Sequence, residues 1–256
     1  MKCLLVLTIF FARSLVLAAC PSPFAVAASE HFWFQDRDLF QLYDSEIRDL
    51  KKNNADQKAL SIAIQAKNIE ALSEFSTSSM NFDPFDPQST LPSKSQAQKI
   101  LKELRSNPVI GDTAQGHYDA TAETGFCFGR AAFVHFALLK LGVKPEHISK
   151  IFVMGGLYRD GTGWDYHVAT AALGAEGQWW VIDSLVDDVL PLQAWMQQVS
   201  KWDGNRINPR IRYYFTAATK FQPIYGTYEA PRLRSPIYKG YFENLAAWYA
   251  NNTCQK

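Results

Sequence analysis

Three strand-like runs separated by short turn signals constrain the fold of this chain more than any other feature of its sequence. The runs are Ile151–Tyr158, Trp164–Leu173 and Trp179–Leu185. They are rich in β-branched and aromatic residues, and the signals between them are Asp160-Gly161 and residues 174–177. Strand-like runs this close together are typical of strands joined by hairpins. The pattern therefore predicts an antiparallel meander.

A nonpolar helix is expected immediately before the meander. Gly125-Phe126 leads into Cys127, and the residues from Ala131 to Leu141 are mostly nonpolar, with Gly142 as the stop signal. A helix that packs on antiparallel strands predicts the α+β fold class. Later elements are predicted as a helix from Pro191 through Val199, a strand over Ile211–Thr219 and a helix over Tyr241–Ala250.

The first 27 residues have the features of a signal peptide. Two apolar runs are separated by Arg13, and neither reaches the roughly 20 residues needed to span a bilayer. Ala25-Val26-Ala27 supplies small residues for cleavage, so we expect residues 1–27 to be removed and the protein to be secreted or periplasmic. A rival site exists at Leu17-Ala18-Ala19-Cys20, which resembles a lipoprotein box and would leave Cys20 lipidated.

Residues 28–92 are predicted to form an N-terminal helical region and a linker. Asp44 or Ser45 is expected to cap a helix that runs to Lys52, and residues 55–75 have a second helical pattern. Residues 76–95 contain three prolines and many small polar residues, which favours a break. A new helix capped by Ser93 or Ser95 then begins the main domain, residues 93–256.

Composition excludes several functional classes. The chain has 256 residues, 47% of them hydrophobic, which is enough for a sizeable core. Its net charge is only +1, from 26 basic and 25 acidic residues, so no strong field indicates nucleic acid as a partner. Spacings typical of a zinc site, a phosphate-binding loop or a dinucleotide-binding fold are also missing from the sequence.

Three polar residues lie at positions that suggest nucleophilic chemistry. Cys127 lies at the expected start of the nonpolar helix, where unpaired backbone N–H groups favour a thiolate. His167 lies in the second strand and Asp183 near the end of the third. A thiol, an imidazole and a carboxylate in this setting are typical of a Cys-His-Asp catalytic triad.

The hairpin between the second and third strands tests whether His167 and Asp183 can meet. A three-residue loop with Gly177 in the left-handed conformation pairs Gly174 with Gln178. That register sets Ala169 opposite Asp183 and makes His167 and Asp183 diagonal neighbours on one face. A loop of two or four residues would place them on opposite faces.

Each of the three residues also has an ordinary structural explanation. After removal of residues 1–27, Cys127 and Cys254 are the two remaining cysteines, so in an oxidising compartment they could form a disulfide. A lone histidine on a strand is usually a surface or core residue, and an aspartate after a strand is often a turn residue. The order and setting of all three together favour the catalytic interpretation.

The segment from Gly125 to Ala132 resembles the nucleophile helix of the transglutaminase-like cysteine-enzyme superfamily. His167-Val168-Ala169 and residues 179–183 are similar to the histidine strand and the aromatic-rich strand of that superfamily. Cys127-Phe128-Gly129-Arg130-Ala131 looks most like the secreted bacterial protein-glutaminases. The resemblance covers roughly residues 115–200. It implies a transglutaminase-like (papain-like) core and an enzyme that deamidates glutamine side chains.

The resulting expectation is an exported hydrolase that acts on proteins or peptides bearing glutamine. Cys127 would be the nucleophile, His167 the general acid and base, and Asp183 the group that orients His167. This chemistry requires no metal or organic cofactor, and the resemblance suggests an inhibitory pro-segment as the role of residues 28–92. The alternatives are a cysteine peptidase or transglutaminase of the same superfamily, and a non-catalytic secreted binding module with an aromatic surface.

Overall fold

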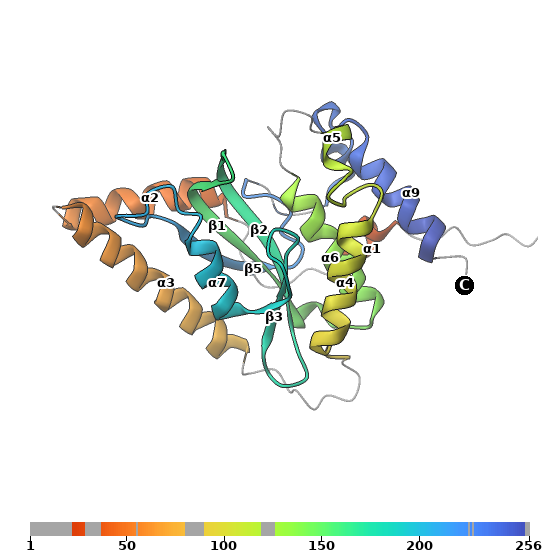
Figure 1. Cartoon of the computed structure of the whole chain (residues 1–256), viewed down its shortest axis with the longest axis horizontal. Coiled ribbons are helices and arrows are strands. Elements are labelled where there is room, and N and C mark those ends of the chain that lie inside the picture. The colour runs from red at the N-terminus through yellow and green to blue at the C-terminus, as the bar shows by residue number, and fades with distance from the viewer. Residues whose placement is uncertain are drawn as a thin grey trace, which may run out of the picture.

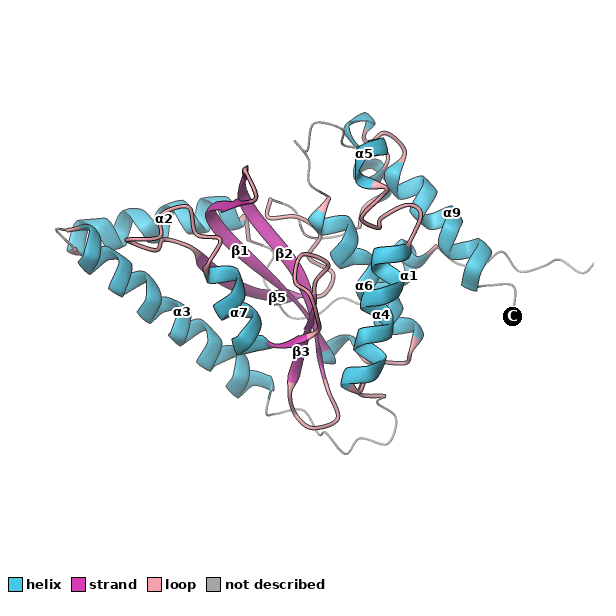
Figure 2. Cartoon of the chain, in the orientation of Figure 1, coloured by secondary structure: helices cyan, strands magenta, loops and turns pink. Residues whose placement is uncertain are grey.

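The computed structural model describes residues 22–28, 37–54, 56–79, 90–118, 126–224, 226 and 228–253. The fold is α+β, as predicted (Figures 1 and 2). The helices are α1 Pro23–Ala28, α2 Leu39–Asn53, α3 Gln57–Ser79, α4 Lys94–Ser106, α5 Gln115–Tyr118, α6 Cys127–Lys140, α7 Leu192–Ser200, α8 Ala230–Leu233 and α9 Tyr241–Thr253, with 3-10 turns at Pro145–His147 and Pro236–Tyr238. The strands are β1 Ile148–Arg159, β2 Thr162–Leu173, β3 Trp179–Ile182, β4 Leu190–Pro191 and β5 Arg212–Ala217.

The strands form one antiparallel sheet in the order β4-β3-β2-β1-β5, which confirms the predicted meander. Asp160 and Gly161 join β1 to β2 with φ angles of 51° and 85°, the two left-handed residues that a tight hairpin needs. The third strand ends at Ile182, three residues earlier than predicted. It ends there because the side chain of Asp183 accepts the N–H of Leu185 and turns the chain away from the sheet.

The loop between β2 and β3 has the predicted three-residue form. Gly177 has a φ angle of 71°, and the N–H of Gly174 donates to the carbonyl of Gln178 at 2.8 Å. The ladder then runs from Leu173–Trp179 to Thr170–Ile182. This is the register that places His167 and Asp183 on the same face, so this prediction is confirmed.

Helices cover both faces of the sheet (Figure 1). On one face α6 packs along β2 with α4 beside it, and Thr170 Oγ1 donates to the carbonyl of Ala131 at 2.7 Å. The buried side chains of α6, among them Phe133 and Phe136, join those of α1, α4 and α9 in one core. On the other face α3 and α7 supply a second core, which contains Trp195 and Phe75. The two cores fix α6 and the sheet relative to each other.

The helix α4 begins and ends as the sequence predicts. Ser93 caps it through a reciprocal capping box with Gln96, and its last residue is Ser106, before Pro108. The helix α6 likewise ends before Gly142, which has a φ angle of 82°.

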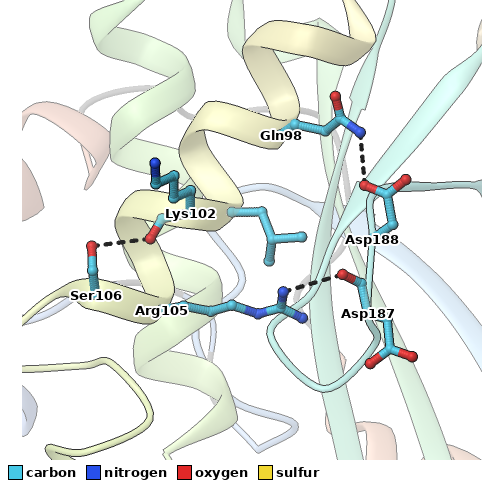
Figure 3. A pocket seen from close by; sticks show the side chains of 7 residues that line it. Gln98, Lys102, Arg105, Ser106, Asp187 and Asp188 are labelled. Atoms are coloured by element: carbon cyan, nitrogen blue, oxygen red, sulfur yellow. Dashed lines mark hydrogen bonds between the residues drawn. The ribbon is translucent and has the colours of Figure 1, made fainter.

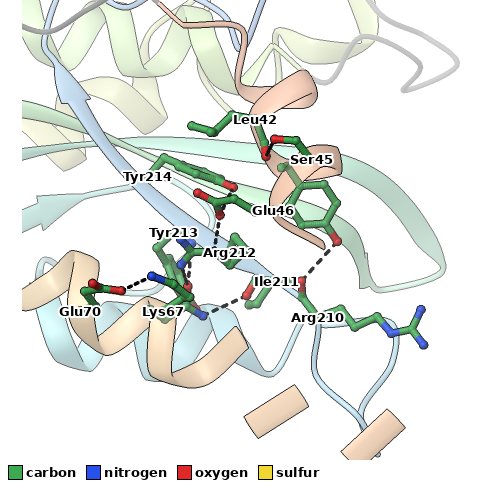
Figure 4. A network of polar contacts seen from close by, with 12 residues as sticks. Leu42, Ser45, Glu46, Lys67, Glu70, Arg210, Ile211, Arg212, Tyr213 and Tyr214 are labelled. Carbon is green, nitrogen blue, oxygen red and sulfur yellow. Dashed lines mark hydrogen bonds and ion pairs between the residues drawn. The ribbon is translucent and has the colours of Figure 1, made fainter. Parts of the chain in front are cut away.

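The helices α2 and α3 pack against β1 and β5 (Figure 4). The buried guanidinium of Arg212 donates to Glu46 at 2.9 Å, and Asn68 accepts the N–H of Tyr213 at 3.1 Å. The start of α2 differs from prediction, because Asp38 rather than Asp44 or Ser45 caps it by accepting two backbone N–H groups. The second helix continues to Ser79, and residues 80–89 of the expected linker lie outside the described residues.

The helix α1 contacts α6 and α9. Its Phe24 is only 5% exposed and packs edge-on against Phe136, Tyr228 and Phe242, with ring centroids 4.9 to 5.8 Å apart. Residues 1–21, including Cys20, lie outside the described residues. Within the described ranges, every helix is too short or too polar to cross a bilayer.

Candidate active site

Cys127 is the first residue of α6 and carries a free thiol. Its side chain is buried, at 8% exposure, in the core between α6 and the sheet. The carbonyl of Phe126 accepts the N–H groups of Gly129 and Arg130, whereas those of Cys127 and Phe128 find no acceptor in the described part of the chain. The sulfur therefore lies beside unpaired N–H groups at the positive end of the helix. Cys254 lies outside the described residues.

The residue before Cys127 has an unusual backbone conformation. Phe126 has a φ angle of 47° and a ψ angle of 21°, which costs about 1–2 kcal/mol for a residue other than glycine. Stacking of its ring on Tyr241, with centroids 4.2 Å apart, holds it in place. Tyr241 also explains Gly129, because a Cβ atom there would lie 2.4 Å from the tyrosine ring. The left-handed conformation of Phe126 therefore sets the direction in which the chain enters α6 at Cys127.

The structure brings His167 and Asp183 together. His167 Nε2 and Asp183 Oδ2 are 2.8 Å apart, and both residues are only 4% exposed. Cys127 lines the same small pocket as His167 and Asp183 and is one of the groups that raise the pKa of the imidazole. The three residues singled out in the sequence therefore lie together, with the carboxylate hydrogen-bonded to the imidazole and the thiol in the same pocket.

Two further donors hold the carboxylate of Asp183. Trp195 Nε1 donates to Oδ2 at 2.9 Å, and the N–H of Leu185 donates to Oδ1 at 3.0 Å. Burial acts to raise the pKa of Asp183, but His167 and these two donors lower it below its ordinary value. The carboxylate therefore stays ionised inside the protein.

The charge of Asp183 affects the protonation state of the His167 imidazole. Burial acts to lower the pKa of His167, but the carboxylate of Asp183 and the neighbouring Cys127 raise it from 6.5 to about 9. At neutral pH the ring is therefore an imidazolium held between a carboxylate and a thiol. This is the protonation state that a cysteine nucleophile and an acid for the leaving group both need.

Two arginines fix the loop that follows Asp183. Arg105 of α4 donates to the carbonyls of Val186 at 2.5 Å and Asp187 at 3.1 Å, and Arg159 of β1 donates to the carbonyl of Leu185. Arg105 also lines an open groove of about 430 Å³ between α4 and this loop (Figure 3). The arginines therefore position the carboxylate through the backbone of its loop.

Sequence reasoning missed Trp195, Arg105 and Arg159. Trp195 follows Asp183 by 12 residues and belongs to α7, so the sequence shows it only as a nonpolar helix residue. The one available signal is chemical: a buried indole N–H needs an acceptor, but the sequence does not indicate which acceptor it finds. The arginines come from elements distant in sequence and carry no comparable signal.

The described residues contain no group of three or more His, Cys, Asp or Glu side chains that could hold a metal ion. No protein-family model matches the chain, and no curated protein is significantly similar to it.

Proposed function

We propose that the protein is a cysteine amidohydrolase that deamidates glutamine side chains in proteins or peptides. The observation that carries this proposal is the hydrogen-bonded pair of His167 and Asp183, which lines one small pocket together with Cys127 at the start of α6. A binding module has no need of a charged imidazole buried between a thiol and a carboxylate, since burying such groups is costly. The choice of glutamine rests on the resemblance of residues 125–132 to protein-glutaminases.

In the proposed reaction, Cys127, His167 and Asp183 each have a role in the formation of the thioester and again in its hydrolysis. The thiolate of Cys127 attacks the carboxamide carbon, and the carbon–oxygen π pair moves onto oxygen. The imidazolium of His167 protonates the nitrogen as the carbon–nitrogen bond breaks, which releases ammonia and leaves a thioester. The neutral imidazole then removes a proton from water as the water oxygen attacks the thioester, and the carbon–sulfur bond breaks, which yields glutamate and restores the Cys127 thiolate and the His167 imidazolium. Asp183 orients His167 and stabilises its charge throughout.

The test is incubation of the purified protein with a glutamine-rich protein such as casein. Deamidation releases ammonia and adds about 1 Da per converted side chain, with no new chain ends. New amino termini instead would indicate a peptidase, and incorporation of an added primary amine would indicate a transglutaminase. If Cys127→Ala releases as much ammonia as the parent, the proposal is wrong.

The same assay examines the proposed inhibitory role of residues 28–92. If this segment inhibits the enzyme, a single cut within residues 80–89 raises the rate of ammonia release. The contacts of Arg212 with Glu46 and of Tyr213 with Asn68 favour continued binding of the N-terminal helices after such a cut. The size of the cut protein in solution then shows whether this segment is released or stays bound.

A further inference from the structure

We infer that the groove between α4 and the loop after Asp183 binds the substrate chain next to the glutamine and selects acidic side chains in it. The inference rests on the proposed deamidation of glutamine in proteins or peptides. It names the feature by which one such substrate is distinguished from another. The groove has a volume of about 430 Å³, which lies in the range of ligand-binding pockets in proteins.

The groove lies beside the small pocket of the candidate triad, because the two have the same walls. On α4, Leu104 lines the pocket that contains Cys127, and Leu101, one turn earlier on the same face, lines the groove. On the loop, Asp183 lines the pocket and Asp187 lines the groove. A polypeptide whose glutamine side chain reaches Cys127 therefore places its neighbouring residues at the groove.

The lining of the groove suits a polar chain better than a nonpolar ligand. Leu101 is the one nonpolar side chain among the described residues that line it, and the others are polar or charged (Figure 3). Pockets for small molecules are instead mostly nonpolar. In an extended polypeptide, successive side chains point in opposite directions, so they meet the two walls in turn. An extended segment of the substrate is therefore the occupant that fits.

The wall formed by α4 is positively charged. Lys102 and Arg105 are one turn apart and both line the groove, and Lys102 is exposed. Within the described ranges, neither forms an ion pair with an acidic side chain. Arg105 donates to the carbonyls of Val186 and Asp187, but these are uncharged, and a guanidinium has further N–H groups to donate. This wall therefore offers two cations to an acidic side chain.

The opposite wall has less negative charge to offset them. Asp188 is already compensated, since it forms an ion pair with Lys94 at 3.2 Å and accepts a hydrogen bond from Gln98 at 2.9 Å. Asp187 is exposed and is the one uncompensated carboxylate among the described residues of the lining. The balance of charge in the groove is therefore positive, which favours acidic side chains over basic ones.

The test measures which of two peptides the full chain prefers. Each peptide has a single central glutamine, flanked by glutamates in one and by lysines in the other. Ammonia release gives kcat/KM for each, and we expect the parent to prefer the glutamate-flanked peptide. In Lys102→Glu the ratio of the two values should fall about fivefold or more, since the variant replaces an attraction by a repulsion. Lys102 is the better test because Arg105 also holds the loop.

Lys99→Glu is the matched control. Lys99 is also an exposed lysine of α4 and changes the net charge by the same amount, but it does not line the groove. Its ratio should stay at that of the parent. An equal fall in both variants means that long-range attraction and not the groove selects the peptide. A parent with no preference, or with a preference for lysines, overturns the inference. So does an equal loss on both peptides in Lys102→Glu.

Binding of the same peptides separates this inference from the proposed function. Fluorescence anisotropy of labelled peptides reports binding to the full chain whether or not ammonia is released. Selective binding that Lys102→Glu weakens, without ammonia release by the parent, contradicts the deamidation and leaves the groove as the binding site. Ammonia release with equal rates and equal binding for the two peptides contradicts only the role of the groove.

Discussion

His167 and Asp183 lie diagonally across the hairpin that joins β2 to β3, with Nε2 and Oδ2 2.8 Å apart. Their meeting depends on Gly177, whose left-handed conformation sets the length of the loop and thereby the register. A slip of one residue would turn one of the two side chains to the opposite face of the sheet. The meeting of His167 and Asp183 is therefore set by a turn of the sheet and not by the helix that carries the thiol.

The order of severity among three substitutions tests the role of each residue. Cys127→Ala should abolish turnover because nothing else forms the thioester, and His167→Ala should be nearly as severe. Asp183→Asn should lose about 10²- to 10⁴-fold in rate, because this residue orients and does not react. Steady-state ammonia release measures the order. Normal turnover in Asp183→Asn would mean that Asp183 is not the third member, and Asp187 would be tested next.

The raised pKa of His167 predicts how turnover depends on pH. In the proposed reaction the imidazolium is the acid for the leaving group, so kcat/KM for deamidation should fall as pH rises through about 9. Alkylation by iodoacetamide needs only the thiolate and should not fall there. Asp183→Asn removes the chief group that raises this pKa, so the fall should move to lower pH. A pH limit that stays in place in Asp183→Asn would contradict the assignment.

The same shift predicts the pH dependence of stability. The folded protein holds the His167 proton more tightly than the unfolded chain, whose histidine pKa is near 6.5. The contribution to the free energy of unfolding is therefore complete below pH 6.5 and is lost as pH rises through about 9. Thermal melting of the parent should show this loss, and His167→Gln should not. Parallel curves for the two proteins would show that the pair does not titrate in this range.

Local signals in the sequence were sufficient for the elements and the register around the candidate site. Gly177 specifies one hairpin, Asp160-Gly161 another, and Ser93 with Gln96 a capping box, because each acts on residues next to it. The start of α2 could not be predicted in this way. Asp38, Asp44 and Ser45 are all good caps, and the choice depends on how the helix packs on the sheet.

The partners of the candidate triad could not be predicted, because they come from distant elements. Trp195 becomes a donor to Asp183 only when α7 packs on the sheet, and Arg105 reaches the loop from α4. Such contacts depend on three-dimensional packing that no short-range pattern encodes.

The indole N–H of Trp195 should contribute to activity through Asp183. Trp195→Phe keeps an aromatic ring in the core but removes the donor to Oδ2, so the pKa of Asp183 should rise and the orientation of His167 should loosen. A hydrogen bond to a charged group contributes about 1.5–3 kcal/mol, so we expect a loss of about tenfold or more in kcat.

Trp179→Phe is the control for this substitution. Trp179 is also buried, but its indole N–H has no partner among the described residues, so its loss removes no hydrogen bond. Turnover should stay near that of the parent. If the two variants lose activity equally, the effect comes from packing and the hydrogen bond to Asp183 does not matter.

The burial of Phe24 predicts which of two mature chains is the more stable. Cleavage after Ala27 removes Phe24, whereas cleavage before Cys20 keeps it against Phe136, Tyr228 and Phe242. Loss of a buried phenylalanine costs about 3–5 kcal/mol. We therefore expect a chain of residues 20–256 to melt at a higher temperature than a chain of residues 28–256. Phe24→Ala in the longer chain should reproduce most of the difference, and equal melting temperatures for the two chains would show that α1 adds nothing to the fold. Mass spectrometry of the protein produced in cells then identifies its amino terminus, and a lipid mass on Cys20 would identify the predicted lipoprotein site as the one in use.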